Sequence, residues 1–260
     1  MYNFDYQRPA DRAAAAAAAK AANARYLAGG QTLIQAMKLR LSSSDALVDL
    51  GGIADLKGIK VDGGTVTIGA TTTHAAVARS AEVQKAIPAL AELAGGIGDQ
   101  MVRNMGTIGG SIANADPAAV LGLGATVNTN RRSIPADSFF TGMYETALQP
   151  GELIVSVSFP VPQKAAYIKY KQPASRFALV GVFVSQGAGG VRVAVTGAKS
   201  SVFRATAIEA ALQASFTPAA AKAVKLPADD MNSDLHGSAA YRAAMVSVMA
   251  ARAVEKALSR

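Results

Sequence analysis

Two glycine-centred segments constrain this chain more than any other feature of its sequence. The first, residues 27–33 (LAGGQTL), lies between a predicted strand at 25–28 and a predicted helix at 32–41. Glycines let the backbone adopt positive φ angles and approach a ligand closely, so several N–H groups can point at one spot. Gln31 and Thr32 add side-chain donors. The segment therefore suits a phosphate group, and a tight strand–helix turn without a ligand is the alternative.

The second segment, residues 103–117 (RNMGTIGGSIANADP), has a similar composition. It combines three glycines with small hydroxyl and amide side chains and one arginine, so it is too polar for a buried strand. We predict an anion-binding loop here, with a bare loop as the alternative. Because a diphosphate needs donors on several sides, two such segments favour a ligand with two phosphates. The signatures G-x-G-x-x-G and G-x-x-x-x-G-K-[ST] are absent, which disfavours Rossmann and P-loop folds.

Composition excludes several classes of protein. The 260 residues are half hydrophobic, enough to bury the core of one large domain or two modest ones. The absence of cysteine excludes disulfides, thiolate zinc sites, iron–sulfur clusters and cysteine nucleophiles on this chain. The two histidines, His74 and His236, are too few and too far apart in sequence to predict a metal site. No apolar run approaches the roughly 18–20 residues of a membrane helix, so we expect no membrane span and a cytoplasmic protein.

The chain is basic, with 26 lysine and arginine residues against 18 aspartate and glutamate residues, a formal charge of +8. The basic residues are scattered and aromatic residues are few. Binding of single-stranded nucleic acid needs interleaved basic and aromatic side chains, so we expect no nucleic acid partner. The favoured explanation of the positive charge is a solvated basic surface. The next is a surface that binds an acidic partner subunit or an anionic cofactor.

The order of predicted elements divides the chain. Residues 1–52 follow the order helix, strand, glycine turn, helix and strand, with Asp11 as a helix N-cap. Residues 59–70 form a predicted hairpin around Asp62-Gly63-Gly64. Prolines are excluded from sheet interiors, so Pro160-Val161-Pro162 predicts a linker.

Beyond this linker three predicted strands precede three predicted helices, which is typical of an antiparallel sheet backed by helices. The fold class is therefore α+β. We predict one domain at residues 1–162, with lobes at about 1–52 and 53–162, and a smaller α+β domain at 163–260.

The sequence also resembles a known family. The runs AGGQTLIQAMK (28–38), RNMGTIGGS (103–111) and PGELI (150–154), with Asn114 and Asp116-Pro117, look like those of the FAD-binding medium subunit of molybdenum hydroxylases. These are the heterotrimeric relatives of xanthine dehydrogenase and aerobic carbon monoxide dehydrogenase. The resemblance covers nearly the whole chain. It implies a two-lobed FAD-binding domain of the vanillyl-alcohol-oxidase/p-cresol-methylhydroxylase type, followed by the smaller α+β domain.

The resemblance also implies where FAD would be bound. Residues 28–33 and 107–111 would wrap the pyrophosphate and the ribityl chain, and Ile97, Ile154 and Lys171 would lie near the isoalloxazine. A cation there stabilises the reduced flavin, although Lys171 could also be a plain surface lysine on a strand. The cofactor-binding residues implied in this way are Leu27, Ala28, Gly29, Gly30, Gln31, Thr32, Leu33, Ile97, Thr107, Gly109, Gly110, Ser111, Asn114, Asp116, Ile154 and Lys171.

In one place the sequence departs from the family. The family usually continues with an aspartate after the alanines at 118–119, whereas Val120 follows here, which leaves Asp116 as the nearest carboxylate. His74 could donate a hydrogen bond to the cofactor or simply cap and pack. We assign no catalytic residue and no metal ligand.

The function implied by the resemblance is electron transfer in an oxidoreductase complex. A large subunit would hold a molybdenum–molybdopterin centre, a small subunit would hold two [2Fe–2S] clusters, and FAD on this chain would reduce an external acceptor (NAD⁺, oxygen or a quinone). One alternative is a self-contained flavin-dependent oxidoreductase on the same fold. Another is a non-enzymatic protein that binds anions or nucleic acid.

Overall fold

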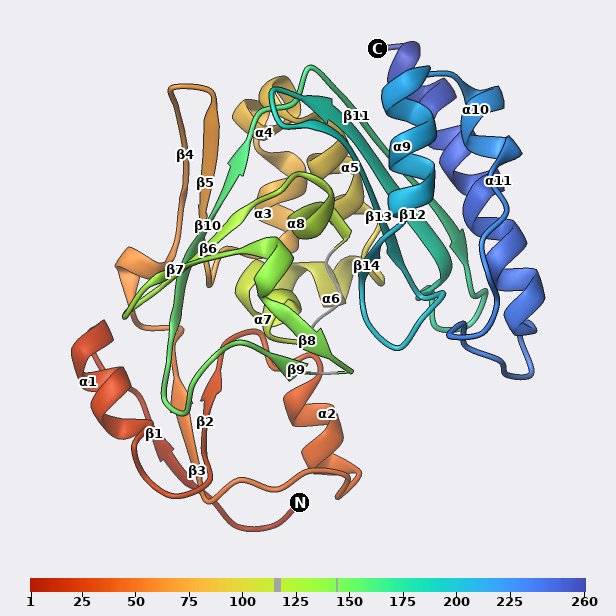
Figure 1. Ribbon diagram of the computed structural model, residues 1–260. Coiled ribbons are helices and arrows are strands. Elements are labelled where there is room, and N and C mark those ends of the chain that lie inside the picture. The colour runs from red at the N-terminus through yellow and green to blue at the C-terminus, as the bar shows by residue number, and fades with distance from the viewer. Residues whose placement is uncertain (115–117, 144) are drawn as a thin grey trace.

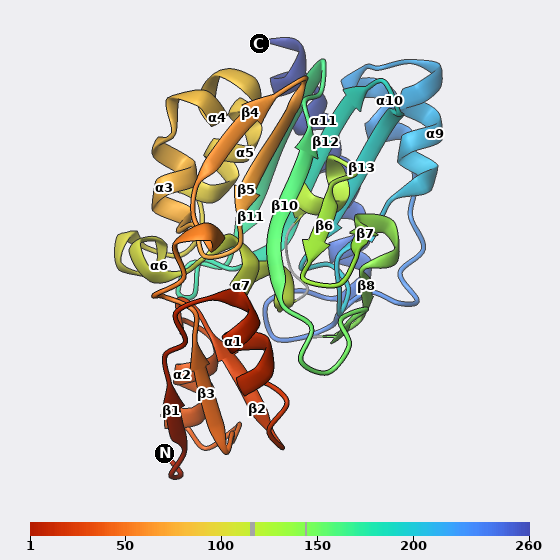
Figure 2. The ribbon, with the colours of Figure 1, turned by 90° about the vertical axis from the view of Figure 1, so that its left-hand side faces the viewer.

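The computed structural model describes residues 1–114, 118–143 and 145–260. A small parallel sheet in the order β1-β3-β2 begins the chain, with two short helices beside it at the foot of the molecule (Figure 2). Asp11 caps the first helix as predicted, because its carboxylate accepts a hydrogen bond of 2.8 Å from the N–H of Ala14. The elements are β1 (Asp5–Gln7), α1 (Arg12–Ala18), β2 (Ala24–Leu27), α2 (Leu33–Lys38) and β3 (Ala46–Asp49).

A five-stranded antiparallel sheet follows, in the order β4-β5-β10-β6-β7. The predicted hairpin around Asp62-Gly63-Gly64 is confirmed as the turn between its first two strands. The middle strand comes last in the sequence, so this sheet closes only when residues 154–160 return to it. The strands are β4 (Ile59–Asp62), β5 (Thr65–Gly69), β6 (Thr126–Thr129), β7 (Ser133–Pro135) and β10 (Ile154–Pro160).

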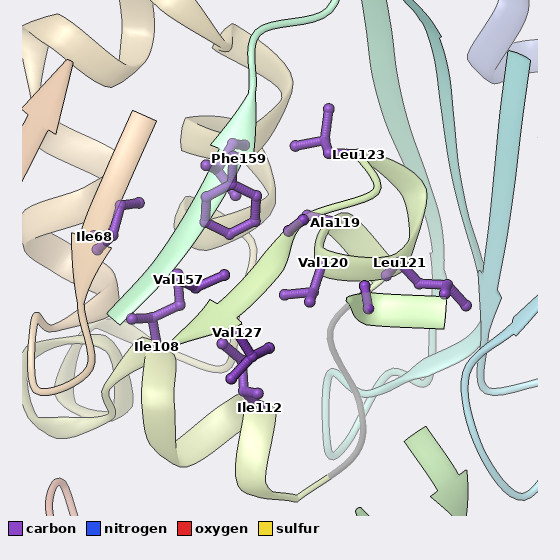
Figure 3. Packing of buried hydrophobic residues seen from close by; sticks show 14 of the residues in the cluster. Ile68, Ile108, Ile112, Ala119, Val120, Leu121, Leu123, Val127, Val157 and Phe159 are labelled. Carbon is purple, nitrogen blue, oxygen red and sulfur yellow. The ribbon is translucent and has the colours of Figure 1, made fainter. Parts of the chain in front are cut away.

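Short helices lie beside this sheet, and α3, α5 and α8 separate it from the C-terminal sheet (Figure 1). Ile108 and Ile112 of α7 are buried against Val127 and Val157, which fixes α7 to the sheet (Figure 3). The helices are α3 (His74–Arg79), α4 (Ala81–Ala86), α5 (Pro88–Gly95), α6 (Gln100–Met105), α7 (Ile108–Ala113) and α8 (Ala118–Gly122). The short elements η1 (Ala54–Leu56), η2 (Ala136–Ser138), β8 (Phe140–Gly142) and β9 (Glu145–Thr146) complete this part.

Over its described residues, 103–114, the second glycine-centred segment is mostly helical, so our prediction of a loop over residues 103–117 is wrong there. Two capping residues explain the difference. The carboxylate of Asp99 accepts a hydrogen bond of 2.9 Å from the N–H of Val102 and starts α6, and the hydroxyl of Thr107 accepts one of 3.2 Å from the N–H of Gly110 and starts α7. Gly106 lies between these two helices.

The C-terminal part confirms the predicted antiparallel sheet backed by helices. Its order is β11-β12-β13-β14. α9 and α11 pack on one face of the sheet, and α5 and α8 pack on the other (Figure 1). The elements are β11 (Lys164–Lys171), β12 (Ala178–Gly187), β13 (Gly190–Thr196), β14 (Phe203–Arg204), α9 (Thr206–Ala214), α10 (Pro218–Ala223) and α11 (Ala239–Leu258).

Pro160 corrects a second expectation, since it ends β10 opposite Thr65 instead of lying in a linker. The N–H of the next residue, Val161, bonds to Gly64 on the β5 side, and β6 pairs with β10 only as far as Ser158. A proline at position 160 therefore leaves no ladder hydrogen bond unmade. Within the described ranges, no helix is long and apolar enough to cross a membrane.

Candidate cofactor site

The two glycine-centred segments touch each other. Gly29 is the second residue after β2, and a Cβ at this position would overlap the carbonyl oxygen of Met105 and lie 2.8 Å from the Cα of Gly106. Only glycine permits this approach, because any side chain would push the first turn away from the end of α6. The next residue, Gly30, has a φ of 68°, a conformation that other residues rarely adopt. The local sequence thus fits both the turn and the contact.

The first turn keeps a row of free backbone donors. The N–H groups of residues 29–33 donate to no described residue, and the amide of Gln31 is held by a 3.2 Å bond from its Nε2 to the carbonyl of Gly29. Leu27 ends β2, Ala28 is half-buried, and Thr32 is exposed. Consecutive N–H groups of this kind form an anion-binding concavity.

The second segment contributes less backbone than we expected. The N–H of Ile108 donates to the carbonyl of Thr72 at 3.0 Å, and the N–H of Gly109 donates to that of Ala70 at 2.8 Å. With the N–H of Gly110 held by Thr107, the amides of residues 108–110 are all used inside the protein. These bonds hold the segment against the residues that follow β5. A ligand would therefore contact side chains of the segment and the open face of one glycine, but not the N–H groups of residues 108–110.

Gly109 and Gly110 therefore have different roles. A Cβ at Gly109 would lie 2.7 Å from the carbonyl oxygen of Ala70, so this glycine serves close packing. A Cβ at Gly110 would meet only the Thr107 hydroxyl, at 3.1 Å, so this glycine presents an open face. Ser111 follows, half-buried, and its hydroxyl bonds to no described residue. Among the described residues of the second segment, Gly110 and Ser111 leave an open backbone face and a hydroxyl for a ligand.

His74 lies where the two segments meet. Its N–H donates to the carbonyl of Gly106 at 2.9 Å, and its ring carbon Cδ2 lies 3.2 Å from where a Cβ of Gly106 would be. The side chain is buried, and burial lowers the pKa of His74 to about 4, so the imidazole is neutral at pH 7. Thr73, and not His74, caps α3 through its hydroxyl, so His74 packs against the turn.

Two hollows lie on either side of the turn between α5 and α6. A small apolar cavity on one side is lined by His74, Ile97, Ile108, Ser111 and Phe159 among others. The predicted residues Ile97 and Ser111 thus share one cavity, although they are separated in sequence by the whole of α6. This places an apolar surface directly beside the second segment.

The hollow on the other side is polar and cationic. Lys171 lines it from the end of β11 and is exposed, while Arg103 lines it from α6. The guanidinium of Arg103 donates to the carbonyls of Ile97 at 2.9 Å and Gly98 at 3.1 Å, which ties the turn to α6. Arg103 belongs to the quoted segment, but no sequence pattern predicted this role, because both acceptors are backbone carbonyls.

Two of the remaining predicted residues, Asn114 and Ile154, line neither hollow. The side-chain amide of Asn114 donates to the carbonyl of Gly110 at 2.7 Å, so it closes the end of α7. Ile154 is 7% exposed and lies in the core of the five-stranded sheet, with no open face at either hollow. Asp116 lies outside the described residues.

The PGELI run ties the small N-terminal sheet to the rest. The hydroxyl of Tyr26 in β2 donates to the carbonyl of Gly151 at 2.9 Å. The buried carboxylate of Glu152 accepts hydrogen bonds from Arg132 at 3.0 and 3.1 Å and from Thr129 at 2.7 Å. The Arg132 bond is the first cause that lowers the pKa of Glu152 to about 2. This motif is therefore structural. Over the described residues, no group of three or more His, Asp or Glu side chains could hold a metal ion.

Comparison with known proteins agrees with this geometry. The family model for the FAD binding domain in molybdopterin dehydrogenase matches residues 2–162. The chain is 37% identical to the carbon monoxide dehydrogenase medium chain of Afipia carboxidovorans, over 99% of this chain and 98% of that one.

Two solved structures are similar over the whole chain. One is the carbon monoxide dehydrogenase from Hydrogenophaga pseudoflava that lacks the Mo-pyranopterin moiety, with a TM-score of 0.88 and 34% identity over 99% of this chain and 98% of that one. The other is quinoline 2-oxidoreductase from Pseudomonas putida 86, with a TM-score of 0.88 and 29% identity over 100% and 98%. These matches confirm the two-lobed FAD-binding fold followed by a smaller α+β domain, with FAD as the cofactor of this chain. The chain therefore belongs to the family of FAD-binding medium subunits of molybdenum hydroxylases and is an oxidoreductase subunit.

Proposed function

We propose that this chain uses FAD to carry electrons from a [2Fe–2S] cluster of a small partner subunit to an external acceptor, with a large partner subunit holding the molybdenum–molybdopterin centre. One observation carries most of the proposal. The contact of Gly29 with Met105 and Gly106 brings the first segment, with its free N–H groups at residues 29–33, against the start of the second segment, four residues before the open face of Gly110.

The residues present fit FAD. The free N–H groups of residues 29–33 suit its pyrophosphate, and the open face of Gly110 leaves room for a phosphate or the ribityl chain. The hydroxyl of Ser111, which bonds to none of the described residues, supplies a further donor. Leu27, Ala28, Thr107 and Asn114 hold these groups in place from β2 and α7, and we keep Asp116 as the proposed acidic contact.

The isoalloxazine belongs beside the turn between α5 and α6. Ile97 supplies an apolar contact there, and Lys171 supplies a cation from the facing strand. When bound, FAD supplies the redox chemistry, and a cation near its ring stabilises the negative charge of the reduced form. Ile154 supports this region from the core of the sheet. The proposed domain boundary remains at 162/163, in the short connection between the end of β10 at Pro160 and the start of β11 at Lys164.

The division of labour among subunits follows from the chemistry of the side chains. A chain without cysteine cannot ligate an iron–sulfur cluster through thiolates, so the clusters belong to a partner. The neutral imidazole of His74 and the paired carboxylate of Glu152 are engaged in packing and ion pairing. Hydroxylation of the substrate is therefore assigned to the large subunit.

The test is the flavin content of the purified protein, in complex with its partners, for wild type and two matched glycine variants. Gly110→Val fills the open face of the second segment. Gly189→Val adds the same side chain where a Cβ would meet nothing within 4 Å. We expect a yellow protein that releases FAD on denaturation for wild type and Gly189→Val, and a colourless folded protein for Gly110→Val.

A colourless wild-type protein would refute the proposal, and normal FAD content in Gly110→Val would remove the second segment from the site. Turnover of an organic substrate by the isolated, FAD-loaded chain would instead favour a self-contained oxidoreductase. A flavin-free protein that binds DNA in a salt-sensitive way would favour the nucleic acid alternative.

A further inference from the structure

The turn that follows α5 has a flexible sequence. Residues 95–98 read Gly-Gly-Ile-Gly, and Gly98 has a φ of 48°, so side chains place few steric limits on this backbone. The last carbonyls of a helix have no partner inside the helix and must find one elsewhere. The position of this turn therefore depends on the groups that bind its carbonyls.

Two cationic side chains bind three consecutive carbonyls of this turn. The guanidinium of Arg103, in α6, donates to the carbonyls of Ile97 at 2.9 Å and Gly98 at 3.1 Å. The ammonium of Lys169, in β11, donates to the carbonyl of Gly96 at 2.7 Å. Hydrogen bonds from charged donors are stronger than those between neutral groups. The turn is thus held both from the FAD-binding part of the chain, through α6, and from the C-terminal part, through β11.

Lys169 is better placed than the other C-terminal cations to hold α5. Lys256 and Arg260 also reach this helix, where both pair with the carboxylate of Glu92. The Glu92 side chain is 44% exposed, and exposed ion pairs contribute little to stability. Lys169 is half-buried on the strand that packs against α5 (Figure 1). Its bond to Gly96 is therefore the polar contact that fixes the end of α5 to the C-terminal part.

We propose that Lys169 is a positioning residue for the flavin. Through the carbonyl of Gly96 it fixes the turn at 95–98 and, with it, the apolar surface that Ile97 presents to the isoalloxazine. This inference rests on the proposed function, because it needs the isoalloxazine beside this turn. Lys171, two residues further along β11, is the exposed lysine proposed as a direct contact, whereas Lys169 acts through the backbone of the turn.

The charge of Lys169 adds to its effect on position. The ammonium is bonded to the residue before Ile97, so its positive charge lies beside the part of the turn that faces the flavin. A fixed cation stabilises the negative charge of reduced FAD more than it stabilises oxidised FAD. Removing Lys169 should therefore change both the affinity for FAD and the balance between its two redox states.

The test compares the purified complex of wild type with Lys169→Met, Lys169→Arg and Lys164→Met. Lys169→Met keeps an unbranched side chain and removes the donor and the charge, whereas Lys169→Arg keeps both. Lys164→Met is the matched control, because it removes the same charge from the other end of β11. We measure the affinity for FAD, the visible spectrum and reduction potential of bound FAD, and the melting temperature of the FAD-free complex.

We expect Lys169→Arg and Lys164→Met to bind FAD within twofold of wild type. Lys169→Met should bind oxidised FAD about three- to tenfold more weakly, because Ile97 loses part of its contact with the ring. It should bind reduced FAD about a further three- to tenfold more weakly, since a nearby positive charge is gone. For a two-electron couple this further loss lowers the reduction potential by about 15–30 mV. The absorption band of the bound flavin should shift in Lys169→Met alone.

Three results would overturn the proposal. The first is a Lys169→Met complex with the FAD affinity, spectrum and reduction potential of wild type. The second is a lower melting temperature of Lys169→Met with an unchanged spectrum and potential, since Lys169 would then stabilise the fold without positioning the flavin. The third is an equal shift of potential in Lys164→Met, which would assign the effect to net charge.

Rescue and cofactor content complete the test. A Lys169→Arg complex as impaired as Lys169→Met would contradict the role of the charged donor. A wild-type complex without FAD would refute the proposed function instead, and its absorption spectrum reports this before any variant is compared.

Discussion

The two adjacent glycines of α7 allow cofactor binding to be separated from folding. Gly110→Ala adds a Cβ that meets only the Thr107 hydroxyl, at 3.1 Å, on a half-exposed helical position. Replacing glycine by alanine inside a helix stabilises it by about 0.5–1 kcal/mol, because the unfolded backbone loses freedom. For a chain of this size we therefore expect the FAD-free protein to melt about 1–4 °C higher than wild type.

The same substitution should weaken FAD binding. The added methyl group occupies the open face of Gly110, where we place a phosphate. Displacing the phosphate from one charge-assisted hydrogen bond costs about 1.5–3 kcal/mol, or roughly a tenfold to hundredfold loss of affinity. Flavin fluorescence during titration of FAD-free protein measures the affinity, and circular dichroism measures the melting temperature.

Gly109→Ala is the matched control for Gly110→Ala. Its Cβ would lie 2.7 Å from the carbonyl oxygen of Ala70, so α7 must move away from β5. We expect a loss of about 1–3 kcal/mol in the free energy of unfolding, as for other overpacked sites. The reasoning fails if Gly110→Ala binds FAD within twofold of wild type, or if it destabilises the protein as much as Gly109→Ala does.

Three further predictions follow from the site. Gly29→Ala should lower the free energy of unfolding by about 1–3 kcal/mol and release FAD, because its Cβ overlaps the Met105 carbonyl; urea unfolding that matches wild type would contradict this. Burial lowers the pKa of His74 to about 4, so below pH 6.5 the unfolded chain takes up a proton that the folded protein does not. The free energy of unfolding should therefore fall by about 3 kcal/mol between pH 6.5 and pH 4. Urea titrations of His74→Gln should lack this pH dependence. Glu152→Gln should lower the free energy of unfolding by about 1–3 kcal/mol above pH 4.5. Because the Arg132 bond lowers the pKa of Glu152 to about 2, the gap in free energy of unfolding between wild type and variant should shrink as the pH falls from 4.5 to 2. A gap that stays constant over this range would contradict the prediction.

Local signals in the sequence predicted much of the fold. The cap at Asp11, the hairpin at Asp62-Gly63-Gly64 and the strands-then-helices order of the C-terminal part are all confirmed. Each depends on residues close together in the chain, where turn chemistry and periodicity act. β1 was not predicted, because its three exposed residues carry no alternating pattern, and it forms only by pairing with β3.

Predictions that depended on distant partners were less complete. A polar, glycine-rich composition suggested a loop over residues 103–117, yet Asp99 and Thr107 cap two helices that take up most of its described part. Pro160 was expected outside the sheet, but a strand accepts a proline where no neighbouring strand needs its N–H. β6 pairs with β10 only as far as Ser158, so no strand lies on that side of Pro160. Asn114 and Ile154 were placed at the cofactor by resemblance, and their roles there are still predictions.

The sequence by itself determined the kind of chemistry that this chain can perform. Its glycines at positions 29, 30 and 110 permit close approach of a ligand, and its lack of cysteine excludes thiolate-bound clusters. Only the tertiary structure decided which backbone N–H groups remain free for a ligand. The N–H groups of Ile108 and Gly109 are not free, because they donate to the carbonyls of Thr72 and Ala70. The tertiary structure also brought Arg103 and Arg176 to one hollow. The physical reason is that a residue type sets local backbone freedom and hydrogen-bonding capacity, whereas the packing of distant segments sets which partner satisfies it.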